Sequence, residues 1–126
     1  MKKIISTIFL LTVVVACLLA FASCGTEAVP NTNPKVAVEA LIDDDYTIIE
    51  NAKDYGSYIF VKARCEEDYI SIWYFDDAKS AVAQYDILEE EYKAAIDKGY
   101  EVSYEFGIFG TVVYYGTSDA IETAAG

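Results

Sequence analysis

The side chains that could take part in acid–base or nucleophilic chemistry are carboxylates, tyrosines and three cysteines, because this chain of 126 residues contains no histidine. Without histidine there is no Ser-His-Asp or Cys-His catalytic unit and no histidine-ligated zinc or iron site. Cys65 ends a stretch in which apolar and polar residues alternate. We expect it to lie half-buried in a strand as a small apolar residue, since no imidazole can activate it as a nucleophile.

The acidic clusters predict surface and capping roles. Asp43-Asp44-Asp45 lacks the glycine and the final glutamate of a calcium-binding EF-hand loop. Glu89-Glu90-Glu91 falls largely on the polar side of a helical pattern, and Asp76 or Asp77 stands where a helix N-cap is expected. Two carboxylates can cleave a glycosidic bond, but only in a pocket that holds them at a set separation. The sequence therefore predicts no catalytic residue, no metal and no cofactor, and an enzyme is not expected.

The charge balance argues against a nucleic-acid partner. The whole chain has 9 Lys and Arg against 21 Asp and Glu, a net charge of −12. Residues 24–126 keep 7 of the basic residues and all 21 acidic ones, so this part carries −14. Affinity for DNA or RNA depends on clustered Lys and Arg that neutralise phosphates, and the basic residues here are scattered. No nucleic acid is therefore expected among the partners.

Two kinds of periodicity predict the elements that would position these side chains. Apolar residues three or four apart, from Ala78 to Ile96, predict a long helix over 77–98. Shorter helices are expected over 36–44 and near the C-terminus, where Thr117 or Ser118 provides a cap. β-forming and alternating residues predict strands at 46–50, 58–65, 69–75, 102–106 and 108–115, with turns at 51–57, 66–68 and near Gly107.

These elements predict one α+β domain over residues 36–126, because a chain of this length is sufficient for a single core. The expected architecture is a two-layer sandwich, an antiparallel sheet of about five strands with the long helix and the shorter helices on one face. A weak internal repeat aligns residues 40–48 with 94–102, with four identities in nine positions. In both copies a helix end is expected to lead into a strand that begins with a tyrosine, Tyr46 or Tyr100.

The other face of the sheet is the expected binding face. Aromatic side chains on a polar surface favour a sugar, a peptide or a second copy of the domain, because they bury large areas at little entropic cost. The alternative is that tyrosine is simply a common strand residue whose hydroxyl stays in water. Strand alternation places the aromatic residues on the face of the sheet opposite to the aliphatic residues. The aromatic residues of this expected binding face are Tyr58, Phe60, Tyr69, Trp73 and Phe75.

The N-terminal residues have the layout of an export signal. Lys2-Lys3 form a basic start, an apolar run extends from Ile4 to Ala22, and small residues precede Cys24. We therefore expect residues 1–23 to be a signal peptide. Residues 24–35 are rich in turn formers, and we expect them to form a flexible linker.

Phe21-Ala22-Ser23-Cys24 resembles the lipobox of bacterial lipoproteins, with Phe21 where leucine is usual. The resemblance covers about 24 of the 126 residues. It implies cleavage between Ser23 and Cys24, attachment of fatty acids such as palmitate through a thioether on Cys24, and anchoring at the outer face of the cell membrane. Beyond this motif the chain resembles uncharacterised small bacterial lipoproteins in general layout only, which implies no functional residues.

Two alternatives for this segment stay open. Ala20-Phe21-Ala22 also fits ordinary secretory cleavage before Ser23, which would give a secreted protein in which Cys24 and Cys65 are free to pair. The apolar run could instead remain as a membrane-spanning anchor, since about 20 apolar residues can cross a bilayer.

The sequence thus predicts a small acidic lipoprotein whose domain works without catalysis, by binding an unidentified protein or small molecule or as an accessory subunit. One alternative is a carboxylate-dependent hydrolase acting on cell-wall or surface polysaccharide, which the acidic clusters and the aromatic face favour. Another is a structural surface protein that self-associates into a homo-oligomer through its tyrosine-rich face or an edge strand.

Overall fold

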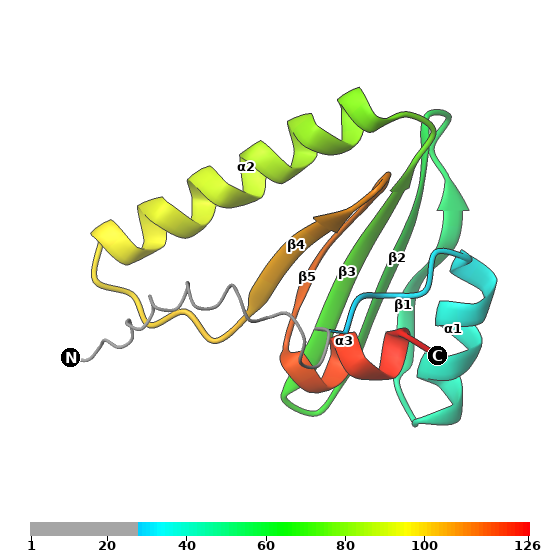
Figure 1. Cartoon of the computed structure of the whole chain (residues 1–126). Coiled ribbons are helices and arrows are strands. Elements are labelled where there is room, and N and C mark those ends of the chain that lie inside the picture. The colour runs from blue at the N-terminus through cyan, green and yellow to red at the C-terminus, as the bar shows by residue number, and fades with distance from the viewer. Residues whose placement is uncertain (1–27) are drawn as a thin grey trace.

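The structure is a computed structural model, and it describes residues 28–126 apart from the side chains of residues 52–54. Within this range three helices and five strands follow one another along the chain (Figure 1). In chain order they are α1 (Pro34–Asp43), β1 (Thr47–Asp54), β2 (Tyr58–Cys65), β3 (Asp68–Phe75), α2 (Ala78–Asp97), β4 (Glu105–Phe109), β5 (Val112–Gly116) and α3 (Ser118–Ala124).

The five strands form one antiparallel sheet in the order β1-β2-β3-β5-β4. The first three strands are joined by hairpins, and α2 then carries the chain across the sheet to its far edge, where β4 begins. The hairpin of β4 and β5 brings β5 back against β3 in the middle. The α+β class, the antiparallel sheet of five strands and the long helix are confirmed.

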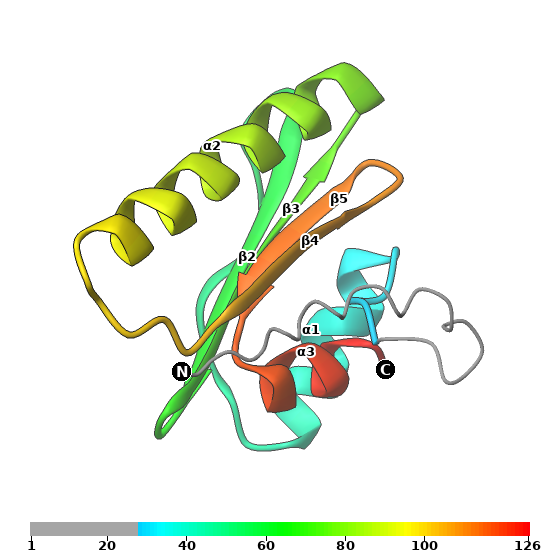
Figure 2. The same ribbon diagram turned by 60° about the vertical axis from the view of Figure 1, so that its left-hand side comes forward.

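The helices cover both faces of the sheet, and not one face as the sequence analysis expects. α1 and α3 pack against one face, whereas α2 lies on the other face over β3, β5 and β4 (Figures 1 and 2). The expected two-layer arrangement is therefore wrong in this respect. Helical periodicity shows that a helix has an apolar side, but it does not show which face of a sheet that side meets.

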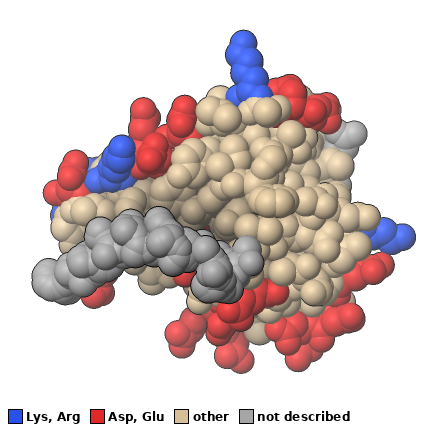
Figure 3. All heavy atoms as spheres, in the orientation of Figure 1, with Lys and Arg blue, Asp and Glu red and all other residues tan. Residues whose placement is uncertain are grey.

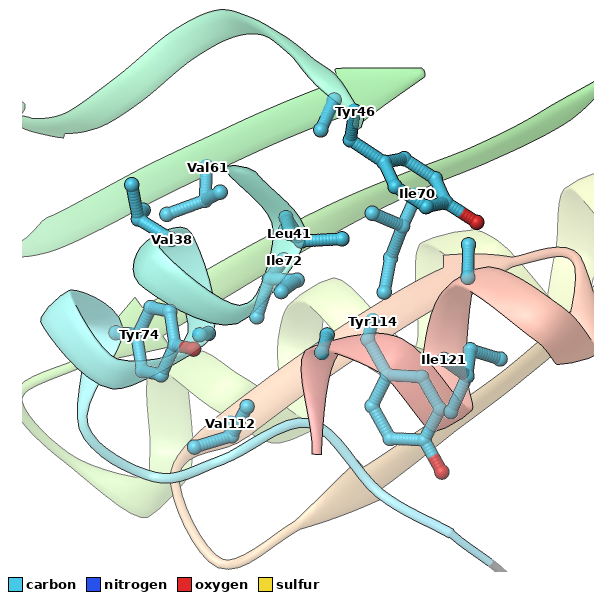
Figure 4. Close-up of a cluster of buried hydrophobic side chains, with 14 residues drawn as sticks. Val38, Leu41, Tyr46, Val61, Ile70, Ile72, Tyr74, Val112, Tyr114 and Ile121 are labelled. Carbon is cyan, nitrogen blue, oxygen red and sulfur yellow. The ribbon is translucent and has the colours of Figure 1, made fainter. Parts of the chain in front are cut away.

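The larger core lies between the sheet, α1 and α3 (Figure 4). Leu41 of α1, Val61 of β2 and Ile72 of β3 are fully buried there. Strand alternation explains this composition, because every second residue of β2 and β3 points to this face. Other members are Val38, Tyr46, Ile70, Tyr74, Val112, Tyr114 and Ile121.

A smaller core joins α2 to the opposite face. Ala81 and Leu88 of α2 are buried against Val113 of β5. The side-chain carboxylate of Asp77 caps this helix by accepting a 2.7 Å hydrogen bond from the backbone N–H of Ser80. Half-buried residues surround the cluster, and they are Trp73, Phe75, Tyr85, Phe106, Ile108 and Tyr115.

Residues 28–33, the described residues before α1, belong to the domain, so this part of the expected linker over 24–35 is wrong. Pro30 is among the fully buried side chains, and the backbone N–H of Asn31 donates to the carbonyl of Ala124 at 2.9 Å. α1 itself begins at Pro34, with the Asn33 side chain as its N-cap. The turn-forming residues predict a flexible linker, but residues 28–33 are held in place by contacts with distant parts of the chain.

Several boundaries also differ from expectation. β1 continues to Asp54 through two irregularities in its register, so the turn covers only 55–57. The turn between β2 and β3 has two residues, with Glu66 at a φ of 57°. Gly107 lies inside β4 opposite Tyr114, and the β4–β5 turn is at Gly110-Thr111 instead.

The two copies of the weak repeat do not fold alike. After α1, the chain passes through Tyr46, which is buried, directly into β1. After α2, Tyr100 is 64 % exposed and residues 101–104 form no strand. The helix ends resemble each other, but the expected strand at 102–106 begins only at Glu105.

The expectations for the N-terminal segment lie outside the described residues. These are the signal peptide over 1–23, cleavage at Ser23 or Cys24, lipidation of Cys24, the alternative anchor Ile4–Ala22 and the first four residues of the linker. Within residues 28–126, none of the helices combines the length and the apolar character needed to cross a bilayer.

Candidate binding groove

The five aromatic residues of the expected binding face do share one face of the sheet. Tyr58 lies opposite Phe75, and Phe60 lies opposite Trp73, with ring centroids 5.3 and 5.1 Å apart. Tyr69 stands on the same face at the other end of β3. All five are half-buried. The face is not open throughout, because α2 packs over Trp73 and Phe75.

The character of this face changes halfway along β2 and β3. Beyond Phe60 the next residues on the same face of β2 are Lys62 and Arg64, and their partners on β3 are Ser71 and Tyr69. A groove of about 450 Å³ lies here, outside the area that α2 covers. We call it the Ser71 groove, and its lining residues are Ile49, Lys62, Ala63, Arg64, Glu66, Glu67, Tyr69, Ile70, Ser71, Ser103 and Tyr115.

Ser71 makes the hollow, because a small side chain stands among large rings. Its neighbours on the same face are Trp73 and Tyr69 along β3 and Tyr115 across on β5. The ring of Tyr115 lies 5.9 Å from that of Trp73 and 6.3 Å from that of Tyr69. Ser71 is only 3 % exposed, so it forms the floor of the groove and not its rim.

The segment between α2 and β4 supplies one wall. Ser103 lines the groove, and the ring of Tyr104 packs 5.4 Å from that of Tyr115 and 6.1 Å from that of Tyr92 on α2. Burial raises the pKa of the Tyr104 hydroxyl, and the nearby carboxylate of Glu91 raises it further. Tyr104 is therefore a neutral hydroxyl at physiological pH.

The groove contains charges of both signs. Lys62 and Arg64 stand side by side along β2, and Glu66 and Glu67 lie on the turn that follows. All four are exposed. Figure 3 shows acidic side chains along α2 and around the end of the molecule where α3 and the β2–β3 turn lie. The two cations of the groove thus lie close to a strongly acidic end.

Cys65 does not take part in the groove. It ends β2 on the opposite face, where it is half-buried against the larger core, as the sequence analysis expects. Burial raises the pKa of the Cys65 thiol, and the carboxylates of Glu66, Asp45, Asp44 and Asp68 raise it further. A thiol with a raised pKa is a poor nucleophile near neutral pH.

A second hollow of about 460 Å³ lies near the β4–β5 turn. Tyr74, Phe75, Phe109 and Val112 contribute to its lining, and Asp76 is its one charged residue. It offers apolar contact but few polar groups that could orient a ligand. The Ser71 groove is therefore the better candidate site.

Sequence reasoning found the aromatic half of this face and missed the polar half. Lys62 and Arg64 alternate with Tyr58 and Phe60, so the strand pattern alone could have placed them on the same face. No local signal could have added Tyr115 or Ser103, because both reach the groove only through the pairing of β5 with β3.

Neither a metal centre nor a similar protein identifies a ligand for the groove. Within residues 28–126, no group of three or more Cys, Asp or Glu side chains is arranged to hold a metal ion. No protein-family model, no curated protein and no solved structure matches the chain.

Proposed function

We propose that this protein is a small acidic lipoprotein, anchored through Cys24 at the outer face of the cell membrane, whose domain binds a ligand without catalysing a reaction. The observation that carries the binding role is the Ser71 groove. Its volume of about 450 Å³ falls in the range of about 300 to 1,000 Å³ that small-molecule sites occupy. Aromatic walls next to a few polar groups are also typical of such sites.

The setting of the carboxylates favours binding over catalysis. Glu66 and Glu67, the two carboxylates that line the groove, are exposed on a two-residue turn. A carboxylic acid that works as a general acid is usually held in an apolar environment that keeps it protonated. An exposed turn does not provide that environment.

The anchor is tested by metabolic labelling of the full chain in a bacterial host with a fatty acid. We expect label on the wild-type protein and none on Cys24→Ser, since only a sulfur forms the thioether. Cys17→Ser and Cys65→Ser are matched controls that should keep the label. Label that persists on Cys24→Ser would show that the anchoring part of the proposal is wrong.

The binding role is tested by filling the floor of the groove. Ser71→Val adds methyl groups to the hollow and suits a strand, so the fold should persist. Small molecules that co-purify with the full chain, identified by mass spectrometry after denaturation, should be depleted in this variant. Ala83→Val on the exposed side of α2 is the control. Equal recovery from both variants and the wild type would contradict the proposal.

A hydrolase remains the alternative, because Glu66 and Glu67 border the same groove as the aromatic rings. It predicts that the full chain releases reducing ends from cell-wall polysaccharide and that Glu66→Gln and Glu67→Gln lose this activity.

Self-association is the other alternative, since β4 is an outer strand with Phe109 53 % exposed at its end. Sedimentation at several concentrations measures it directly.

A further inference from the structure

The ligand chemistry can be inferred from the order of side chains along the groove. Three cross-strand pairs of β2 and β3 follow one another on this face. The first is a pair of rings, Phe60 and Trp73. The second is Lys62 with Ser71, and the third is Arg64 with Tyr69. Residues two apart on a strand are about 7 Å apart. A small ligand can therefore touch aromatic rings and a cation at the same time.

The two cations are available to a ligand. Lys62 and Arg64 are exposed, and among the residues that the structure describes neither forms an ion pair. Arg64 is also the sole arginine of the chain. A guanidinium presents a planar fork of N–H donors that matches a carboxylate in a two-bond geometry.

The acidic residues of the groove limit the charge of the ligand. Glu66 and Glu67 follow the cations along the same groove, and the domain around it is strongly acidic. A polyanion would meet these carboxylates and be repelled. A ligand with one anionic group can pair with Lys62 and Arg64 while its uncharged part stays among the rings.

From this order we infer that the Ser71 groove binds a small monocarboxylate with an aromatic ring. The ring would lie over Ser71 against the exposed sides of the Tyr69 and Tyr115 rings, and the carboxylate would be held by Lys62 and Arg64. This inference rests on the proposed binding function and adds the chemical class of the ligand.

Trp73 makes the test direct, because it is the one tryptophan of the chain and borders the groove. The full chain in detergent would be titrated with 3-phenylpropanoate, 3-phenylpropanol and 2-phenylethylamine, followed by Trp73 emission and by calorimetry. The three probes share a phenyl ring and differ in charge. We expect saturable binding of the anion and binding about tenfold or more weaker for the alcohol and the amine.

Charge-removing variants identify the cations. Lys62→Gln with Arg64→Gln should weaken binding of 3-phenylpropanoate about tenfold or more, and raised salt should weaken it in the wild type. Lys93→Gln with Lys98→Gln removes the same charge from the exposed surface of α2 and its C-cap, and should leave the affinity unchanged. Far-ultraviolet circular dichroism checks that each variant is folded.

Three outcomes would overturn the inference. They are no saturable binding of the anion by either readout, binding of the amine or the alcohol as tight as that of the acid, and equal affinity in the Lys62/Arg64 variant. If the alcohol binds as well as the acid and Ser71→Val abolishes both, the groove is a binding site and only the ligand class is wrong. The co-purification test with Ser71→Val judges the proposed function separately.

Discussion

The hydroxyl of Tyr74 donates a 2.8 Å hydrogen bond to the backbone carbonyl of Asn31. Tyr74 lies on the central strand β3 with its ring in the larger core, and Asn31 precedes α1. Because the backbone N–H of Asn31 also donates to Ala124, this short segment is attached to both the sheet and α3. The bond explains how residues with a linker-like sequence become part of the domain.

Replacing Tyr74 by phenylalanine should lower the free energy of unfolding by about 1 kcal/mol, because the carbonyl of Asn31 loses its donor while the ring stays packed. Urea denaturation measures the change. Tyr100→Phe is the matched control, since that side chain is 64 % exposed and its hydroxyl should not matter. Equal stability of the two variants would show that the bond contributes nothing.

The same pair predicts a dependence on alkaline pH. Burial raises the pKa of Tyr74 well above its ordinary value of 10.0, so the folded state holds this proton more tightly than the unfolded state does. The resulting stability is fully present below pH 10 and is lost as the pH rises above it. The difference between wild type and Tyr74→Phe should therefore shrink in urea titrations above pH 10, and a constant difference would contradict this.

The N-cap of α2 should depend on Asp77 and not on its neighbour. Asp77→Ala removes the acceptor for the N–H of Ser80 and should lower the Tm by a few degrees, whereas Asp76→Ala should not. The hydrogen bonds from Ser80 lower the pKa of the Asp77 carboxyl. The stability from this group is thus present above the ordinary pKa of 3.8 and is lost as the pH falls through the lower folded value. Thermal scans of both variants at neutral and acidic pH test this.

Gly107 is required by the ring across from it. A Cβ at this position would lie 2.5 Å from the hydroxyl oxygen of Tyr114. Gly107→Ala should therefore cost about 1 to 3 kcal/mol of stability. Adding Tyr114→Leu should recover part of the loss, because the clashing atoms belong to a side chain, and a double-mutant cycle measures that coupling.

Gly116 provides a control for the double-mutant cycle of Gly107 and Tyr114. A Cβ there would overlap the backbone oxygen of Tyr69, which no side-chain change removes. Gly116→Ala combined with Tyr69→Leu should then show additive losses. Coupling of equal size in both cycles would mean that the sheet adjusts its backbone at both glycines.

The thiol of Cys65 should react slowly near neutral pH. Burial and four nearby carboxylates raise its pKa, so its thiolate fraction is smaller than that of an ordinary cysteine. Iodoacetamide labelling of the folded full chain, followed by mass spectrometry of the peptide that contains Cys65, should be slower than labelling of the urea-unfolded chain. The labelling rate should still be rising with pH at the ordinary thiol pKa of 9.0, and a rate that levels off below pH 9 would contradict this.

The local sequence pattern was sufficient to predict the place of a residue where that place depends only on its own helix or strand. The alternation of β2 separates Val61 from Phe60 without further information, and Asp77 with the spacing of Ala81 and Leu88 defines α2. Local pattern failed at Gly107, because glycine marks a turn in sequence, whereas here it makes room for the ring of Tyr114 on another strand.

The sequence by itself determined the α+β class, the two-sided strands, the long capped helix and an acidic chain without histidine chemistry. Only the tertiary structure decided that α2 covers the aromatic face and leaves the part over Ser71 open. The physical reason is that periodicity records whether an element has an apolar side, while the partner of that side depends on packing between residues far apart in the chain. The candidate site exists because such packing places Tyr115 and Ser103 beside two cations of β2.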